Sequence, residues 1–451
     1  MSEPASPPLH PEARVQRLLR NATWLFSGNA IASLCGFGQA VVLGRALGVD
    51  TYGLLAVIMA FVTTVNQIVD IRMWESVTKF VGDFHERGDH GRARATVKLA
   101  YLIDIATGII AFLLVCVLAP LAVHRFLHGR VAAEDVILFA GTLLVATVND
   151  TSMALLRVFD RFDWLSAERV ASAIVRLLAL WAVAAATGRL TPVLAVYVAV
   201  ELGRGIVLLL LGLRATRHAL TAPGPDHLGA VKDRLGAFWR FTLNNAATTV
   251  LALITRQVDI LILTALRPPA EVGLFRMAKN FGQLILRLSD PVYHAIYPEL
   301  VRLVTNAPRE IGAFIRRSMR VVLVLVIPAG LFLIVAAGPV LELAVGRDFA
   351  AAAGPLRIVV LGALLHAGFL WARPLALARG RSHLSTIAHA AGAVVLVAAS
   401  YLLVPRLGAI GSALTFVASS AATVAILAAG AVRGNRADHA TRATRATRRP
   451  G

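Results

Sequence analysis

Apolar runs long enough to cross a lipid bilayer recur along the whole sequence. A transmembrane helix needs about 20 mostly apolar residues to span the hydrocarbon core. The chain has 451 residues, of which 57% are hydrophobic and only 16% are charged. That is too little charge to cover the surface of a soluble protein. We therefore predict an all-α integral membrane protein, since a spanning helix satisfies its own backbone hydrogen bonds.

The apolar runs predict about twelve transmembrane helices. They lie roughly at 22–43, 52–77, 99–122, 134–156, 167–187, 191–213, 240–265, 272–297, 320–342, 355–378, 384–403 and 408–430. The connections between them are short, and the longest leave too little chain for a folded soluble domain. No convincing cleavage site follows the first run, so we expect it to be a retained span.

Two similar turns indicate an internal duplication. The segments 43–53 and 265–275 are short polar turns between apolar runs, and Gly53-Leu54 matches Gly273-Leu274. The offset of about 220 residues also relates Phe61 to Phe281, Gln67 to Arg287, Asp70 to Asp290 and Arg161 to Arg381. Six spans per half is an even number, so both halves enter the membrane in the same direction. This predicts two lobes related by a pseudo-twofold axis along the membrane normal.

The charge distribution predicts the topology. Lysine and arginine outnumber aspartate and glutamate by 45 to 26, which gives a formal charge of +19. Most of these cations fall in alternate connections, and the positive-inside rule makes those connections cytoplasmic, together with both termini. This rule accounts for the charge, so we expect no nucleic acid partner. The predicted segments are a cytoplasmic N-terminal segment 1–21, a lobe 22–213, a cytoplasmic linker 214–239, a lobe 240–430 and a basic disordered cytoplasmic tail 431–451.

One predicted span, 272–297, carries a continuous polar stripe. Its members are Arg276, Lys279, Asn280, Gln283, Arg287, Asp290 and His294, which fall within an arc of roughly 100° on a helix. Such a stripe must face protein or water rather than lipid. It either holds helices together through internal pairs or forms the wall of a hydrated cavity, and its positive charge suits an anionic group. In the preceding span, Arg256 and Asp259 are close enough to pair with each other on one helix.

The sequence offers little for catalysis or metal binding. Its two cysteines, Cys35 and Cys116, lie inside apolar runs, and its twelve histidines form no metal-type pairing. A phosphate-binding loop is missing because no Gly-Lys-Ser/Thr occurs. We expect no enzyme activity, no metal and no cofactor, apart from a coupling cation, H⁺ or Na⁺, whose identity stays open.

Three motifs resemble those of a known family. The turn 43–53, the segment Arg256-Gln-Val-Asp259 followed by 271–275, and the segment 377–381 with 404–413 occur in order along the duplicated frame. Together they resemble bacterial polysaccharide flippases of the multidrug/oligosaccharidyl-lipid/polysaccharide exporter superfamily, over about residues 20–430. The resemblance implies a MATE-like two-lobed fold that works by alternating access.

The implied function is translocation of a polyprenyl-pyrophosphate-linked oligosaccharide across the bacterial cytoplasmic (inner) membrane. Arginine and lysine are natural partners of phosphate oxygens. We expect the diphosphate to be received by Arg276, Lys279, Gln283, Arg287 and Arg256, and coupling or cavity pairing to use Asp70, Asp259 and Asp290. The expected partners are the lipid-linked substrate, membrane lipid and polysaccharide assembly proteins, and the protein is expected to function as a monomer.

Several alternatives stay open. An ion-coupled drug or organic-cation antiporter belongs to the same superfamily, but many of those carry an acidic residue in the first span, and 22–43 has none. Lipid II transport is another cargo within the superfamily. A membrane-embedded glycosyltransferase or polymerase needs acidic residues in a substantial aqueous loop, and the short outer turns offer few. A purely structural scaffold does not explain a charged stripe inside the membrane.

Overall fold

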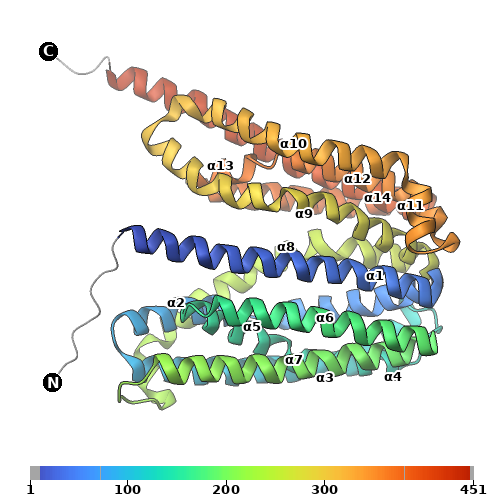
Figure 1. The fold of residues 1–451 in the computed structure, drawn as a ribbon, viewed down its shortest axis with the longest axis horizontal. Helices are drawn as coiled ribbons and strands as arrows, with labels where there is room; N and C mark the ends of the chain where they lie inside the picture. Colours follow the sequence, from blue (N-terminus) through green and yellow to red (C-terminus); the bar gives the residue numbers. More distant parts are fainter. Residues whose placement is uncertain (1–10, 72, 380, 447–451) are drawn as a thin grey trace. The chain divides into compact units, whose positions relative to one another are not determined.

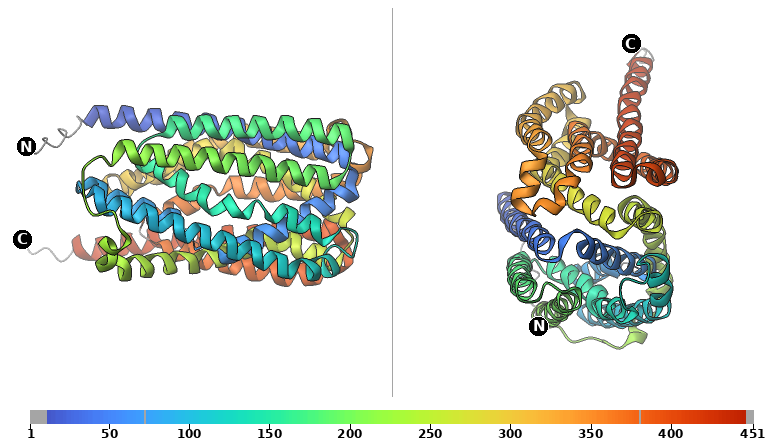
Figure 2. Two further views of the ribbon diagram at one scale, coloured as in Figure 1. Left: turned by 90° about the horizontal axis from the view of Figure 1, so that it is seen from below. Right: turned by 90° about the vertical axis from the view of Figure 1, so that its right-hand side faces the viewer.

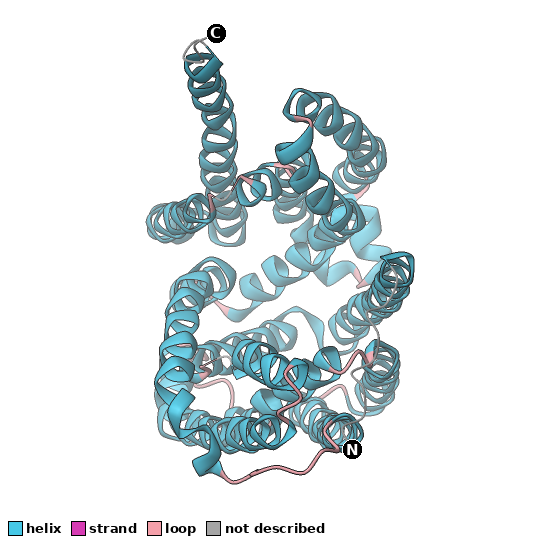
Figure 3. Ribbon diagram, turned by 90° about the vertical axis from the view of Figure 1, so that its left-hand side faces the viewer, coloured by secondary structure: helices cyan, strands magenta, loops and turns pink. Residues whose placement is uncertain are grey.

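The computed structural model describes the backbone at 11–71, 73–379 and 381–446 (Figure 1). Side chains at 11–22, 25–26, 243–258 and 431–446, and at a few single positions within 290–305 and at 382, lie outside the described residues. Every regular element in the described part of the chain is a helix, and that part contains no strand (Figure 3). The prediction of an all-α membrane fold is confirmed.

The chain divides into two compact units. The first unit comprises 1–39, 65–119 and 133–247. Its elements are the start of α1 (Pro11–Val69), α2 (Met73–Glu86), most of α3 (His90–Arg125), α4 (Ala133–Ala140), α5 (Leu143–Val158), α6 (Phe162–Thr187), α7 (Leu190–Ala219), η1 (Leu228–Arg234) and the start of α8 (Leu235–Leu266). Helix α7 packs against both α5 and α6 (Figure 2).

The second unit comprises 40–64, 120–132 and 248–451. Its elements are the end of α1, most of α8, α9 (Pro269–Asn306), η2 (Pro308–Glu310), α10 (Ile311–Val335), α11 (Ala337–Ala344), η3 (Arg347–Ala352), α12 (Ala353–Gly368), α13 (Ala372–Ala378) and α14 (Ser382–Ala446). Helix α9 is central to this unit, because it packs against α10, α12, α13 and α14.

Eight helical stretches in the described residues are long and apolar enough to cross a membrane. Two of them hold two predicted spans each, because α1 bends at Gly48 and α14 bends at Gly408, where φ is 71° and 55°. Glycine adopts positive φ without a Cβ clash, so it can join two helices at such a bend. Helix α8 covers the predicted span 240–265, and helix α9 covers the predicted span 272–297, which carries the polar stripe. The two helices are 32 and 38 residues long.

The two compact units do not coincide with the predicted lobes. Residues 40–64 and 120–132 fall in the second unit, although the predicted first lobe runs from 22 to 213. One physical reason is the turn 43–53, where the backbone at Gly53 approaches the backbone at Pro269 so closely that a Cβ atom would lie 1.9 Å from the Pro269 oxygen. The pseudo-twofold relation of the lobes stays a prediction.

The predicted linker 214–239 is folded onto the first unit. The Arg94 guanidinium on α3 donates hydrogen bonds to the carbonyl oxygens of Leu220 and Ala222, over 2.8 Å and 2.9 Å. Lys98 Nζ bonds Asp226 Oδ2 over 2.7 Å, and η1 contributes Val231 to an apolar cluster beneath. We call residues 220–234 the strap, since they lie across the start of α3.

At the C-terminal end, α14 continues as a helix through Ala446, where a disordered tail 431–451 was predicted. The side chains of that stretch and of 11–21, and all of residues 1–10 and 447–451, lie outside the described residues. The cytoplasmic placement of both ends therefore stays a prediction.

Candidate functional site

Helix α9 carries the predicted polar stripe, and its sequence explains where it begins. Pro269 occupies the first helical positions, where its missing N–H needs no partner. Glu271 lies in the first turn, and its Oε2 accepts a hydrogen bond from the Ala409 N–H over 2.9 Å. This bond joins the start of α9 to the bend in α14 at Gly408.

Lys279 and Asp259 form a buried ion pair between α9 and α8. The Lys279 Nζ atom lies 2.6 Å from Asp259 Oδ2, and the side chains are 11% and 1% exposed. Lys279 Nζ also lies 5.9 Å from the centre of the buried Phe275 ring. The predicted pairing of Asp259 was with Arg256 on its own helix, whereas the structure places Lys279 of the next helix against it.

The structure divides the predicted stripe into two faces. Arg276, Asn280 and Gln283 are half-buried and Arg287 is exposed, so residues at intervals of four, three and four share the less buried face of α9. Lys279 lies on the buried face with Phe275 and Ala278. A charged face of this kind on a membrane helix must meet protein or water. We call Arg276, Asn280, Gln283 and Arg287 the α9 polar face.

Three predicted site residues are not placed at this site. The side chains of Arg256 and Asp290 lie outside the described residues. Asp70 belongs to the first unit, where it follows the last residue of α1 and its N–H donates to the Asn66 oxygen over 2.7 Å. The roles predicted for all three stay predictions.

The duplicated turns meet beside the α9 polar face. Tyr52, from the turn 43–53, accepts a hydrogen bond from Asn280 Nδ2 over 2.9 Å. Its ring packs edge-on against Phe349, with ring centres 5.9 Å apart. The turn motif therefore fixes an amide of the stripe in position. In the fold, the turn 43–53 packs against the equivalent turn of the other half.

A second set of membrane charges lies in the first unit. Arg204 on α7 donates to Glu168 on α6 over 3.0 Å and to Glu201 over 2.9 Å. Arg176 on α6 also pairs with Glu201, and Asn149 Nδ2 donates to Glu201 Oε1 over 3.1 Å. Two arginines and two glutamates balance, so this set suits internal pairing better than anion binding. Glu168 is not among the candidate residues predicted from the sequence. Its charge, opposite to that of Arg204 on the neighbouring helix, could have pointed to it.

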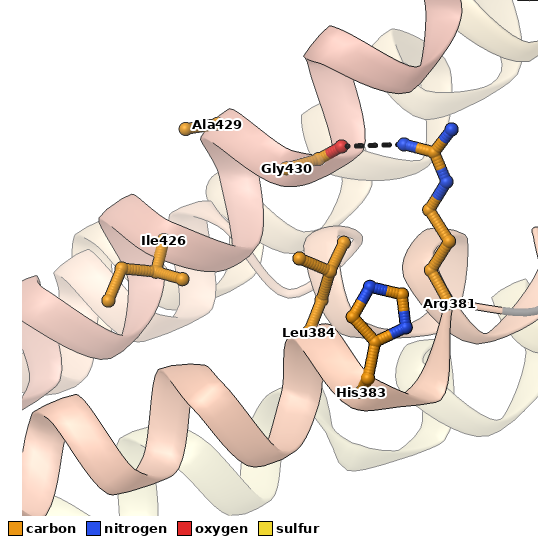
Figure 4. Close-up of a pocket in the computed structure, with 6 residues that line it drawn as sticks. All are labelled: Arg381, His383, Leu384, Ile426, Ala429 and Gly430. Atoms are coloured by element: carbon orange, nitrogen blue, oxygen red, sulfur yellow. Dashed lines mark hydrogen bonds between the residues drawn. The ribbon is translucent and has the colours of Figure 1, made fainter.

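One cavity in the second unit is lined by none of the predicted site residues. It has a volume of about 580 Å³ and lies between the two arms of α14, lined by Arg381, His383, Leu384, Ile426, Ala429 and Gly430 (Figure 4). Arg381 points towards Gly430 and bonds its carbonyl oxygen over a long 3.5 Å. The walls are mostly apolar, and this arrangement supports no assignment.

The fold and these intramembrane charges define a multi-pass membrane protein. A family model described as "Polysaccharide biosynthesis protein" matches residues 18–304. That is more than half of the chain, so the chain belongs to this family. The predicted relation to a polysaccharide family is confirmed.

A curated relative and two solved structures agree with this assignment. Inner membrane protein YghQ of Escherichia coli (strain K12) is 20% identical over 163 residues, which are 35% of this chain and 44% of that protein. The chain thus matches less than half of the length of that relative. The relative's name agrees with the expected inner membrane location.

The solved structures show the fold. Lipid II flippase MurJ in an inward closed conformation has a TM-score of 0.68 at 14% identity, covering 89% of this chain and 86% of that one. An inward-facing multidrug resistance MATE family transporter of the MOP superfamily has a TM-score of 0.70 at 12% identity, covering 90% and 95%. The predicted MATE-like fold is confirmed. At these identities the likeness does not distinguish one cargo from another.

Proposed function

We propose that this protein is a flippase that moves a polyprenyl-pyrophosphate-linked oligosaccharide across the membrane by alternating access. The observation that carries the proposal is the α9 polar face, which presents Arg276 and Arg287 at the less buried side of a central membrane helix. Placing a cation at membrane depth costs at least about 2.5–3.5 kcal/mol, so a cation kept there has a function. A diphosphate is the part of such a substrate that needs cations.

The residues of the α9 polar face can bind different parts of the substrate. Arg276 and Arg287 lie three helical turns apart, which is about 16 Å along the helix axis. Each guanidinium can hold phosphate oxygens through two parallel N–H bonds. Gln283 lies between them and supplies an amide for a sugar hydroxyl or a phosphate oxygen. The prenyl chain stays in lipid while the glycan occupies water.

Lys279 enters this mechanism through its pair with Asp259. The 2.6 Å contact satisfies the ammonium in the absence of cargo. A diphosphate that reaches Lys279 competes with the Asp259 carboxylate for the ammonium group, and a buried carboxylate left without its cation is costly. Substrate binding and ion coupling would then meet at one residue pair. Arg256, Asp290 and Asp70 keep their predicted roles as further cation and coupling residues.

The comparisons support the cargo class without identifying the glycan. The family description refers to polysaccharide biosynthesis, and one solved structure of this fold is that of a lipid II flippase. No cofactor is required by this mechanism, and a coupling cation, H⁺ or Na⁺, would supply the energy. Polysaccharide assembly proteins are the partners that such a flippase serves, and we propose that it acts as a monomer.

A deletion strain tests this function. We expect the polyprenyl-linked glycan to accumulate on the cytoplasmic leaflet of that strain, and the wild-type protein to restore export. Arg287→Ala should fail to restore it at equal protein level, because the head group loses a cation. Arg302→Ala is the matched control on the same helix, since Arg302 is 75% exposed and pairs only loosely with Glu299 over 3.6 Å. Normal glycan export in the deletion strain, together with altered dye efflux, would contradict the proposal.

A further inference from the structure

Seven buried side-chain atoms inside the first unit have no hydrogen-bond partner among the described residues. Two are Asn66 Oδ1 and His85 Nδ1, and the other five are Asp104 Oδ2 on α3, Asn149 Oδ1 and Thr151 Oγ1 on α5, and Glu168 Oε2 and Arg176 Nε on α6. Buried polar atoms are nearly always satisfied, so such atoms are explained by ordered water or a bound ion. Both donors and acceptors occur in this set, which is what a chain of water molecules requires.

Asp104 is deeply buried in the first unit. The residue is 2% exposed, near the middle of α3. Thr147 Oγ1 on α5 donates to the Asp104 carbonyl oxygen over 2.8 Å. One turn further along, a Cβ atom on Gly108 would lie 2.9 Å from the Leu143 oxygen, so α3 and α5 are in close backbone contact. The Asp104 carboxyl is therefore held at a fixed place between these helices, beside Thr151.

The charged neighbours of Asp104 among the described residues include two acidic residues, Asp70 after α1 and Asp150 on α5. Tyr101, one turn earlier on α3, contacts Ser152 on α5 over 3.0 Å and packs against Gly212 of α7. Asp104 forms no ion pair with any residue that the structure describes.

Two intramembrane arginines of the first unit, Arg176 and Arg204, are already paired with glutamates. Arg204 bridges Glu168 and Glu201, and Arg176 pairs with Glu201. Asn149 joins this set to α5 through its bond with Glu201. Among the described residues, a bare carboxylate at Asp104 would be buried without a paired cation, which is costly in protein and more so in the membrane.

We propose that Asp104 is a proton-binding site of the first unit. The neutral acid carries its proton on Oδ2, and Thr151 Oγ1 accepts the hydrogen bond. Release leaves the carboxylate on Asp104 and transfers the proton to a water molecule beside it. The site stands independently of the proposed cargo, and only its use in driving transport rests on the proposed function.

Infrared difference spectroscopy of the full-length protein in lipid nanodiscs tests the site without any transport assay. We expect a carbonyl band of a protonated carboxylic acid at neutral pH that shifts in D₂O and disappears at high pH. Asp104→Asn should remove this band, whereas the exposed control Asp226→Asn should keep it. A band that is missing from the wild type, or unchanged in Asp104→Asn, would overturn the proposal.

A second variant keeps the test open if Asp104→Asn does not fold. Thr151→Val preserves side-chain shape but removes the hydroxyl, so the band should remain and move in frequency. An unmoved band in Thr151→Val contradicts the proposal. Loss of the wild-type band on adding sodium chloride at constant pH also contradicts it, because a metal ion would then displace the proton.

Discussion

Gly53 and Gly273 pack backbone against backbone in the second unit, and the internal duplication makes them equivalent positions. A Cβ atom on Gly53 would lie 1.9 Å from the Pro269 oxygen, and one on Gly273 would lie 2.4 Å from the Val49 oxygen. Only glycine fits at either position without a shift of the main chain. The repeated turn therefore keeps glycine in both copies because the copies touch each other.

Gly53→Ala should destabilise the protein by roughly 1–3 kcal/mol, because the added methyl group meets backbone that cannot rotate away. Thermal unfolding in detergent measures this as a lower melting temperature. Gly36→Ala is the control in the same helix, since no atom lies within 4 Å of the added Cβ. It should be neutral or slightly stabilising. Equal melting temperatures for the two variants would show that the close approach does not exist.

The Lys279–Asp259 pair should show strong coupling in a double-mutant cycle. Either single alanine variant leaves a buried charge without its partner, at a cost of about 3–5 kcal/mol. The double variant should lose much less than the sum of the two.

The exposed pair Arg87–Asp83 is the matched control for that cycle. Its N–O distance is 2.7 Å, close to that of the buried pair, but its side chains are 59% and 41% exposed. Its coupling should stay below about 1 kcal/mol. Additive effects at Lys279 and Asp259 would mean that they do not pair.

This pair also shows what the sequence can predict and what it cannot. The spans and the all-α fold follow from hydrophobic length, which is a local property of each segment. Lys279 and Asp259 were both candidates, but helical spacing alone could only offer Arg256 as a partner for Asp259. How far neighbouring helices rotate about their axes depends on packing between them. The separation of Lys279 from the α9 polar face follows from that rotation.

The strap illustrates a similar limit. Residues 214–239 are polar and lie between two apolar runs, so the pattern predicts a linker. The sequence does not reveal that Arg94 reaches three carbonyl oxygens of the strap, at Leu220, Ala222 and Gly224. Every residue has a backbone carbonyl oxygen, so the sequence does not show which of them accept hydrogen bonds from Arg94.

Arg94→Ala should release the strap. Its charged hydrogen bonds contribute on the order of 1.5–3 kcal/mol each, so amide hydrogen exchange at 220–227 should become about tenfold faster or more. The core helices α5 and α7 should keep their protection. Arg87→Ala is the control, because Arg87 pairs with Asp83 on its own helix. Unchanged exchange in the strap of Arg94→Ala would contradict the hydrogen bonds described.

The strap should also loosen as the pH falls below neutral. The Ala222 N–H donates to His90 Nδ1 over 3.0 Å, which requires that nitrogen to carry no proton. The neighbouring His85 ring, with its centre 5.7 Å from that of His90, has a lowered pKa because of burial and then of His90. Folding lowers the pKa of His85 from its ordinary value of 6.5, so the unfolded chain takes up a proton first as the pH falls. The stability that the neutral ring contributes at higher pH is therefore lost as the pH falls below 6.5.

Hydrogen exchange at Ala222, corrected for the intrinsic rate, should therefore be faster at about pH 5.5 than at about pH 7.5. The Lys98 bond holds the pKa of Asp226 below its ordinary value, so that contact persists through this range. His85→Asn removes the ring whose pKa is lowered, and it should remove most of the step. A step of full size in His85→Asn would assign the effect to another group.

The central claim is that the α9 polar face receives the diphosphate of a lipid-linked glycan during its passage across the bilayer. The most direct measurement uses purified protein in liposomes that contain a polyprenyl-diphosphate sugar with a fluorescent label. An impermeant glycosidase reports how much substrate changes leaflet. We predict rapid transfer by the wild type and by Arg302→Ala, and transfer reduced at least tenfold in Arg276→Ala and Arg287→Ala. Equal transfer by all four proteins, or transfer no faster than in protein-free liposomes, would contradict the claim.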